Sequence, residues 1–169
     1  ADKILGLLAN CSRVEPGLLR TIRRLLPSSE ADAGTEADVW MHKDIMGTCK
    51  LGMTISQNDE VQTKLKKRFD NEPVELRLKV EEAMRVWHKN LPKEIWHAEF
   101  LNLPEEDQKQ FPEIYDIARA DFKKLIQTIA SRGQGLQIKS RIGIYDWFRR
   151  FRMRSAKNAE IWAKGDDLS

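Results

Sequence analysis

The sequence predicts an all-α fold, a compact bundle of about seven or eight short amphipathic helices in a single domain over residues 1–169. Apolar residues recur every three or four positions along most of the chain, which is the spacing of one helical face. Prolines and small polar residues separate these stretches, at positions suited to beginning or ending helices. We see no repeat of fixed period and no convincing sheet. The domain is expected to be either complete or a fragment of a longer chain.

Two helices are expected before residue 27. A short one covers residues 3–10. Pro16 suits the first position of the second, and Pro27 ends it. The apolar stripe of this second helix consists of Leu18, Leu19, Ile22, Leu25 and Leu26. Its opposite side carries Arg20, Arg23 and Arg24, which form one candidate partner-binding surface.

A third helix is expected over residues 35–46, after an acidic polar loop at 28–34. Thr35 is predicted as its N-cap, with Asp38 as the acid of a capping box. Trp40 is predicted to be a buried anchor against the second helix, and Gly47 to end the third. Thr35, Asp38 and Trp40 are therefore expected to have structural roles. Residues 48–56 fit either a loop or a short buried strand.

The later part of the chain continues the helical pattern. Either Ser56 or Asn58 would cap a helix over 59–69, and Pro73 would open the next, which ends near Asn90. Its first residues, "VELRLKV", also alternate with the period of a strand, but helical spacing explains a longer span. Helices are further expected over 91–104, from the acidic residues 105–107, from 112 to about 130, and over 143–164, with a turn at 131–135.

Catalytic and metal-binding motifs are weak or absent in the sequence. No phosphate-binding glycine loop occurs. Asp38 and His42 lie four apart, so both could face one ion, but such pairs are common by chance. The two cysteines, Cys11 and Cys49, have no local catalytic signature and fit small buried side chains. Among the acids, Glu99 is the nearest candidate for a shifted pKa, although an exposed helical face explains it equally well. We therefore predict no catalytic residue, no metal and no cofactor.

Residues 139–157 form a basic segment with interleaved aromatic side chains. The net charge of the whole chain is only +3, so nucleic-acid binding would have to depend on such a local patch. The candidate contact residues are Trp147, Arg149, Arg150, Arg152 and Arg154. Three roles remain open for the segment: a helix that docks its aromatic face on the core, a surface for a protein partner, or a nucleic-acid-binding module.

A family resemblance is carried by "LLRTIRRLLPSSEADAGTEADVWMHKDI", with Gly34, Glu36, Ala37, Asp38 and Trp40 matching as a block. This stretch resembles the helical accessory region of large bacterial multidomain proteins that carry a formylglycine-generating-enzyme-like (sulfatase-modifying-factor) module. "VWHKNLPKEIWHAEFL" is similar to a later segment of that region. The resemblance covers residues 15–103 and brings no catalytic residues. It implies an accessory domain of a regulatory or conflict-system protein.

Together these observations predict a non-catalytic interaction or adaptor domain that binds a partner protein or a neighbouring domain. Nucleic-acid binding through residues 139–157 is the alternative. A helical regulator or target in a CRISPR-associated protease pathway would have a similar appearance. The chain has no apolar run of the roughly 20 residues that a membrane span needs, so we expect no membrane partner. The two isolated cysteines, Cys11 and Cys49, suit reduced thiols, so we expect a cytoplasmic location.

Overall fold

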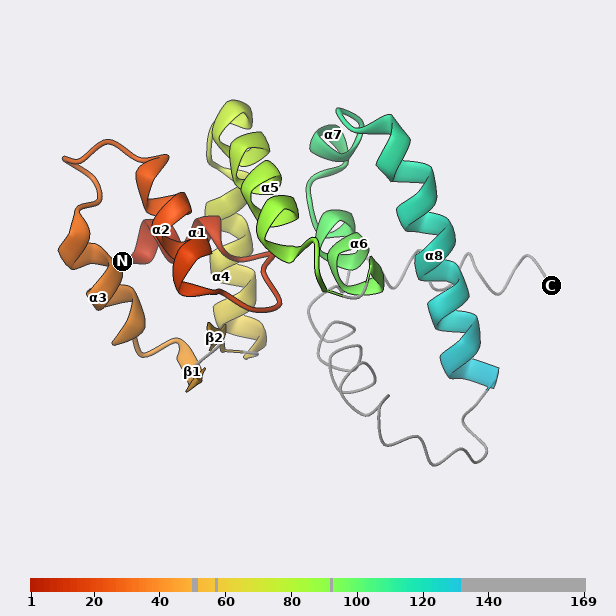
Figure 1. Ribbon diagram of the computed structural model, residues 1–169, viewed down its shortest axis with the longest axis horizontal. Coiled ribbons are helices and arrows are strands. Elements are labelled where there is room, and N and C mark those ends of the chain that lie inside the picture. The colour runs from red at the N-terminus through yellow and green to blue at the C-terminus, as the bar shows by residue number, and fades with distance from the viewer. Residues whose placement is uncertain (50–51, 57, 92, 132–169) are drawn as a thin grey trace.

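The computed structural model describes residues 1–49, 52–56, 58–91 and 93–131 (Figure 1). Within these ranges the protein is mainly helical, as the sequence predicts, with a small two-stranded sheet. The helices are α1 (Asp2–Leu7), α2 (Pro16–Arg24), α3 (Ala33–Trp40), α4 (Asp59–Asp70), α5 (Val74–His88), α6 (Lys93–Leu101), α7 (Glu105–Gln108) and α8 (Pro112–Ser131). The strands are β1 (Ile45–Cys49) and β2 (Gly52–Ile55). The predicted turn at 131–135, beyond its first residue, and the helix at 143–164 lie outside the described residues.

The helix start signals in the sequence are confirmed at several positions. Pro16 occupies the first turn of α2, and the Asn58 side chain accepts hydrogen bonds from the amides of Glu60 and Val61 at the start of α4. Pro73 precedes α5, whose fifteen residues are helical throughout. The strand alternative for "VELRLKV" is therefore wrong, because the longer helical stripe buries more apolar surface than a period-two face would.

The third helix differs from its prediction at both ends. Asp32 is the N-cap, and Thr35 stands at the third helical position and completes a reciprocal capping box with it. Thr35 is thus not the N-cap, and Asp38 is an exposed residue outside the box. The helix ends at Trp40 instead of Met46, and Gly47 lies within β1.

The small sheet was missed as a feature of the fold, although a short strand was one option for residues 48–56. β1 and β2 pair antiparallel, with an irregularity between Ile45 and Gly47. On its other side β2 meets the preceding chain through a bridge between Met53 and Val14. Gly52 has a positive φ of 155°, and a Cβ there would lie 2.6 Å from the Val14 carbonyl oxygen. Glycine is therefore needed at the point where the N-terminal segment crosses the sheet.

The apolar core is formed mainly by α1, α2, α4 and α5. Fully buried side chains come from each of these helices and include Leu5, Leu19, Ile22, Phe69 and Val80. Figure 1 shows α5 in the middle of the molecule, with α1 and α2 on one side and the group formed by α6, α7 and α8 on the other. Since α6 and α8 pack against each other and α5 contacts α2, α6 and α7, α5 joins the two groups.

Trp87 fixes the packing of α5 on α2. A Cβ at Gly17 would lie 1.9 Å from the Trp87 ring, so the indole occupies the space that glycine leaves free. The indole nitrogen of Trp87 also donates a hydrogen bond of 3.2 Å to the Thr21 hydroxyl. We infer that any side chain at position 17 would displace this tryptophan.

Candidate functional site

α5 presents three different faces to its surroundings. One is apolar and buried, and includes Val80 and Met84. The second is polar yet buried: Arg77, Glu81 and His88 follow at helical spacing and are 4%, 2% and 0% exposed. The third, which begins with Glu75, is exposed. Burying charged groups is costly unless they are paired. Among the described residues, this buried polar face is therefore the candidate functional site.

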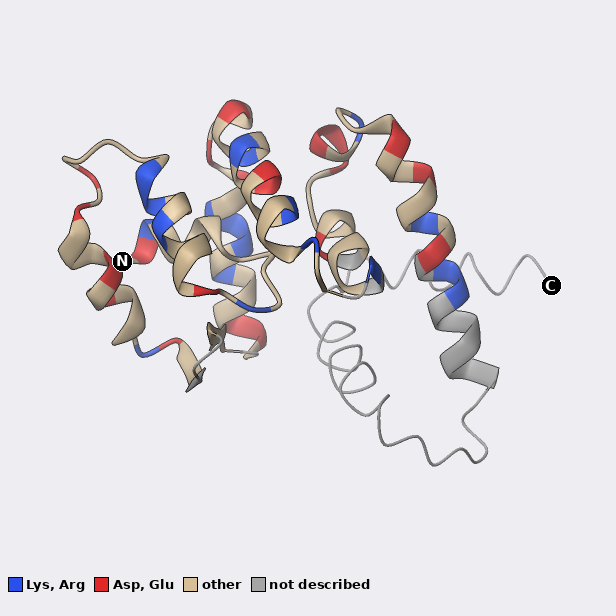
Figure 2. Ribbon diagram, in the orientation of Figure 1, with Lys and Arg blue, Asp and Glu red and all other residues tan. Residues whose placement is uncertain are grey.

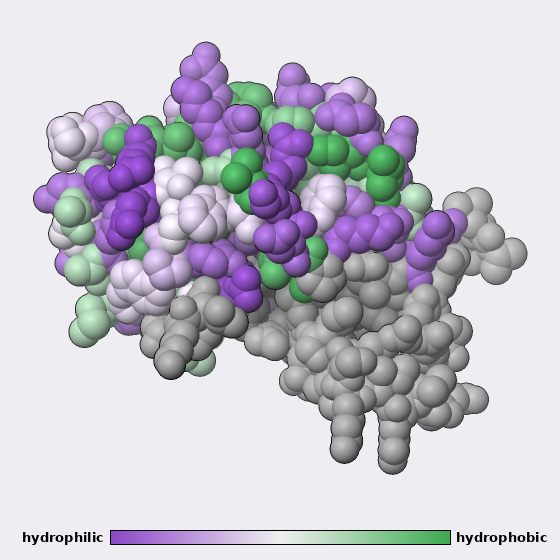
Figure 3. All heavy atoms as spheres, in the orientation of Figure 1, coloured by the Kyte–Doolittle hydropathy of each residue, from purple (hydrophilic) through white to green (hydrophobic). Residues whose placement is uncertain are grey.

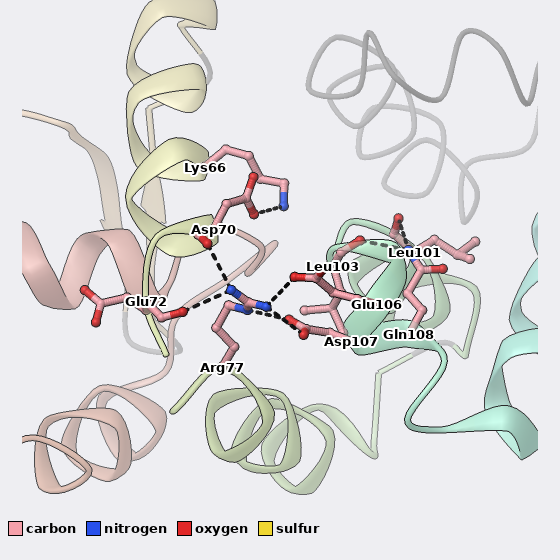
Figure 4. A network of polar contacts seen from close by, with 9 residues as sticks. All are labelled: Lys66, Asp70, Glu72, Arg77, Leu101, Leu103, Glu106, Asp107 and Gln108. Atoms are coloured by element: carbon pink, nitrogen blue, oxygen red, sulfur yellow. Dashed lines mark hydrogen bonds and ion pairs between the residues drawn. The ribbon is translucent and has the colours of Figure 1, made fainter. Parts of the chain in front are cut away.

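At the N-terminal part of α5, Arg77 forms the first of two ionic junctions (Figure 4). Its guanidinium donates to both carboxylate oxygens of Asp107, at 2.6 and 2.9 Å, and to Glu106 at 2.8 Å. It also donates to the backbone carbonyls of Asp70 and Glu72, at 2.9 and 3.0 Å. The bond from Asp107, which is itself 1% exposed, raises the pKa of Arg77 above its ordinary value. This Arg77 junction ties α5 to α7 and to the end of α4.

At the C-terminal end of α5, His88 forms the second junction. Its Nδ1 lies 2.6 Å from the Glu99 carboxylate of α6, and its Nε2 lies 3.1 Å from the Glu15 carboxylate just before α2. Glu99 also accepts the backbone N–H of Ser12 at 2.6 Å, and Glu15 accepts from Arg13 at 2.8 Å. The His88 junction therefore connects α5, α6 and the segment that leads into α2.

The two carboxylates decide the charge of His88. Burial by itself lowers the pKa of a histidine, but hydrogen bonds and charge attraction from Glu15 and Glu99 outweigh it and raise the pKa of His88 to about 10. Burial also works to raise the pKa of Glu15, but the bonds from His88 and Arg13 hold it below its ordinary value. At neutral pH the junction therefore contains an imidazolium between two carboxylates.

Glu81 lies between the two junctions and behaves differently. Burial raises the pKa of Glu81 to about 8, against the attraction of Arg85. Arg85 is 3.9 Å away and also covers the Phe111 ring, 4.3 Å from its centroid. At neutral pH the carboxyl of Glu81 is therefore mostly protonated and uncharged. The buried polar face of α5 then carries positive charges at Arg77 and His88, with a largely neutral group between them.

The His88 junction has the components of an acid–base pair but the geometry of a structural one. A general base needs a ring nitrogen free to reach a substrate. Both nitrogens of His88 already meet a carboxylate, and the side chain is fully buried. Among the residues that the structure describes, no group of three or more His, Cys, Asp or Glu side chains is arranged to hold a metal ion. We therefore interpret the His88 junction as a structural contact that holds the helices together.

The predicted arginine surface on α2 is only partly available. Arg20 and Arg24 are exposed, whereas the Arg23 guanidinium donates to Glu36 of α3 at 2.6 Å. Figure 2 shows basic segments along α2. Trp147, Arg149, Arg150, Arg152 and Arg154 lie outside the described residues.

Other predicted residues have different environments from those expected. Trp40 packs against the core but is only partly buried, and Val39 is the fully buried residue beside it, so the burial predicted for the tryptophan is only partly found. Asp38 and His42 do not share a helix, because α3 ends at Trp40. Cys11 is buried as expected.

The exposed-face alternative for Glu99 is also wrong, because the residue is 3% exposed and bonded to His88. The sequence analysis did not recognise His88, Glu15 and Glu81 as residues of this buried polar site. A signal for two of them exists, since Arg77, Glu81 and His88 make a polar stripe at helical spacing within an otherwise apolar pattern. Their carboxylate partners give no such signal, because they lie on other elements.

Comparison with known proteins finds no matching family model, curated protein or solved structure. In the part of the chain that the structure describes, no helix combines the length and the apolar character that crossing a membrane would require.

Proposed function

We propose that this chain is a non-catalytic interaction domain of a bacterial regulatory or defence-system protein, which binds a partner protein or a neighbouring domain. The resemblance of the "GTEADVW" block to accessory regions of such proteins supports it. The geometry adds that Arg77 and His88, both buried on α5, are bonded to carboxylates of other elements, so these two side chains are not directed at a ligand.

The observation that carries the proposal is a pair of exposed methionines next to α3. Met41 is 86% exposed and directly follows α3, and Met46 is 70% exposed and lies in β1, so the two stand on either side of the short connection between these elements. Methionine is flexible and polarizable, so it suits contact surfaces that adapt to a partner. Burying these two large apolar side chains against a partner would be favourable, because apolar surface would be removed from water.

The test is site-specific cross-linking in cells of the native host. A photoreactive amino acid at Met41 is expected to give an adduct with one defined protein, and Met46→Asp in the same chain is expected to abolish it. Val74, 46% exposed at the start of α5, provides the control position for the photoreactive group. No adduct from Met41, or the same adducts from positions 41 and 74, would contradict a partner surface at the methionines.

Nucleic-acid binding is the second candidate, and it rests on the basic and aromatic composition of residues 139–157. Labelled DNA or RNA would then bind at low salt and dissociate as salt is added. Arg149→Glu combined with Arg150→Glu should remove this binding. Lys64→Glu combined with Lys67→Glu, on the exposed side of α4, is the charge-matched control and should retain it. Absence of any binding at low salt would exclude this candidate.

A further inference from the structure

The exposed face of α5 forms a surface of its own, distinct from the methionine pair. It consists of residues at helical spacing, namely Glu75, Leu78, Lys79, Glu82, Val86 and Lys89. Val86 is 60% exposed, and Leu78 is half-buried. Beside this face a hollow of about 520 Å³ lies between α5 and the residues that lead into α8, with Phe111 in its wall. Figure 3 shows apolar patches among hydrophilic side chains on one side of the molecule.

The charges at the two ends of this α5 face are arranged in a self-complementary way. Glu75 lies at the N-terminal end of the helix and Lys89 at its C-terminal cap. Neither forms an ion pair with another residue that the structure describes. If a second helix of the same sequence ran antiparallel alongside, Glu75 would stand level with Lys89 of the second copy. Leu78 would stand level with Val86 of the second copy, so both kinds of contact would occur twice.

We propose that the exposed face of α5 is a homodimer interface, in which the α5 helices of two copies pack antiparallel. Each helix lies against the hollow of the other, and the apolar side chains at its edge are covered. A pair of single helices buries less than the roughly 1,600 Å² of a standard interface, so the dimer forms only at high protein concentration. Glu82 lies at the two-fold axis of this arrangement and meets its own copy, which weakens the association further.

The interface is tested by sedimentation velocity of the full 169-residue chain over a range of concentrations. The chain should sediment as a monomer when dilute and as a dimer when concentrated. Val86→Asp should abolish the dimer, and Glu82→Gln should strengthen it by removing the repulsion at the axis. Glu75→Lys and Lys89→Glu should each weaken the dimer on the order of tenfold, because two attractions become two repulsions. The double variant Glu75→Lys with Lys89→Glu restores both pairs and should recover the dimer.

A matched charge swap on another helix provides the control. Glu60→Lys and Lys64→Glu are both on the exposed side of α4 and should leave the sedimentation unchanged. All of these residues are exposed, so a thermal melt by circular dichroism should confirm that each variant is folded. The proposal is wrong if the chain remains monomeric at every concentration. It is also wrong if a dimer forms that neither Val86→Asp nor the single charge reversals affect.

Discussion

The two ends of α5 both pair a buried cation with carboxylates, but the two cations respond differently to pH. Each end buries a positive charge among carboxylates from other elements, but Arg77 keeps its charge at every accessible pH, whereas His88 does not. Arg77 also satisfies two backbone carbonyls, so its removal leaves more groups without partners. The carboxylates at His88 have second donors, Ser12 and Arg13. We therefore expect the Arg77 junction to contribute more stability and the His88 junction to be the one that responds to pH.

The largest effect is expected from Arg77→Ala. The change leaves Asp107 buried without its cation and removes two donors from backbone carbonyls, so it should cost about 3–5 kcal/mol in the free energy of unfolding. Urea unfolding followed by circular dichroism measures the loss. Arg77→Lys keeps the positive charge but loses the planar guanidinium, so its free energy of unfolding should lie between those of the parent and Arg77→Ala. An Arg77→Ala protein as stable as the parent would show that the junction is not needed.

A smaller loss is expected from His88→Ala, about 2–4 kcal/mol, because two carboxylates lose a charged donor but keep another one. The same urea titration applies, with Lys79→Ala as the control for a change on the exposed face of α5. If His88→Ala destabilises the protein more than Arg77→Ala does, the ranking of the two junctions is reversed.

The free energy of unfolding should fall as pH rises from neutral to alkaline. The pKa of His88 is about 10 in the folded protein and 6.5 as its ordinary value, so its contribution is complete below 6.5 and is lost as pH rises through 10. The pKa of Glu81 is raised from 4.5 to about 8, so its contribution is largest below 4.5 and is lost by pH 8. Deprotonated His88 still keeps one hydrogen bond, so the junction weakens as pH rises but is not lost completely.

Variants at the two junctions separate their parts in this pH dependence. Urea midpoints between pH 6 and pH 10 should decline more gently in His88→Gln than in the parent. Arg77→Gln should keep the slope of the parent, since neither arginine nor glutamine titrates in this range. An equal slope in all three proteins would mean that His88 is not the group responsible.

The smallest effect is expected at an exposed feature far from α5. Asp32→Ala should lower the melting temperature slightly, since it removes the side chain that caps α3. Asp38→Ala is the matched control, because Asp38 is exposed outside the capping box, and it should change stability by less than about 0.5 kcal/mol. Thermal melts at neutral pH would compare the two, and an equal loss in both would contradict the assigned cap.

Local signals explain where prediction from the sequence succeeded and where it failed. Pro16, Asn58 and Pro73 mark helix starts through their own backbone and side-chain chemistry, and α2, α4 and α5 begin there. The end of α3 was misjudged because β1 continues the apolar pattern, and its strand is stabilised by pairing with β2. β2 in turn pairs with Val14, nearly forty residues away in the chain.

For the candidate site, the sequence by itself determined which groups α5 carries: Arg77, Glu81 and His88 at helical spacing on one side, and an exposed mixed face on another. It also made Glu99 a candidate residue, with an exposed helical face as the alternative. Only the tertiary structure decided the partners, because His88 meets Glu99 from 11 residues away and Glu15 from 73 residues away. Helical spacing follows from the backbone geometry of one element. The pairing of charges follows from how separate elements pack, and that packing sets their burial and hence their pKa values.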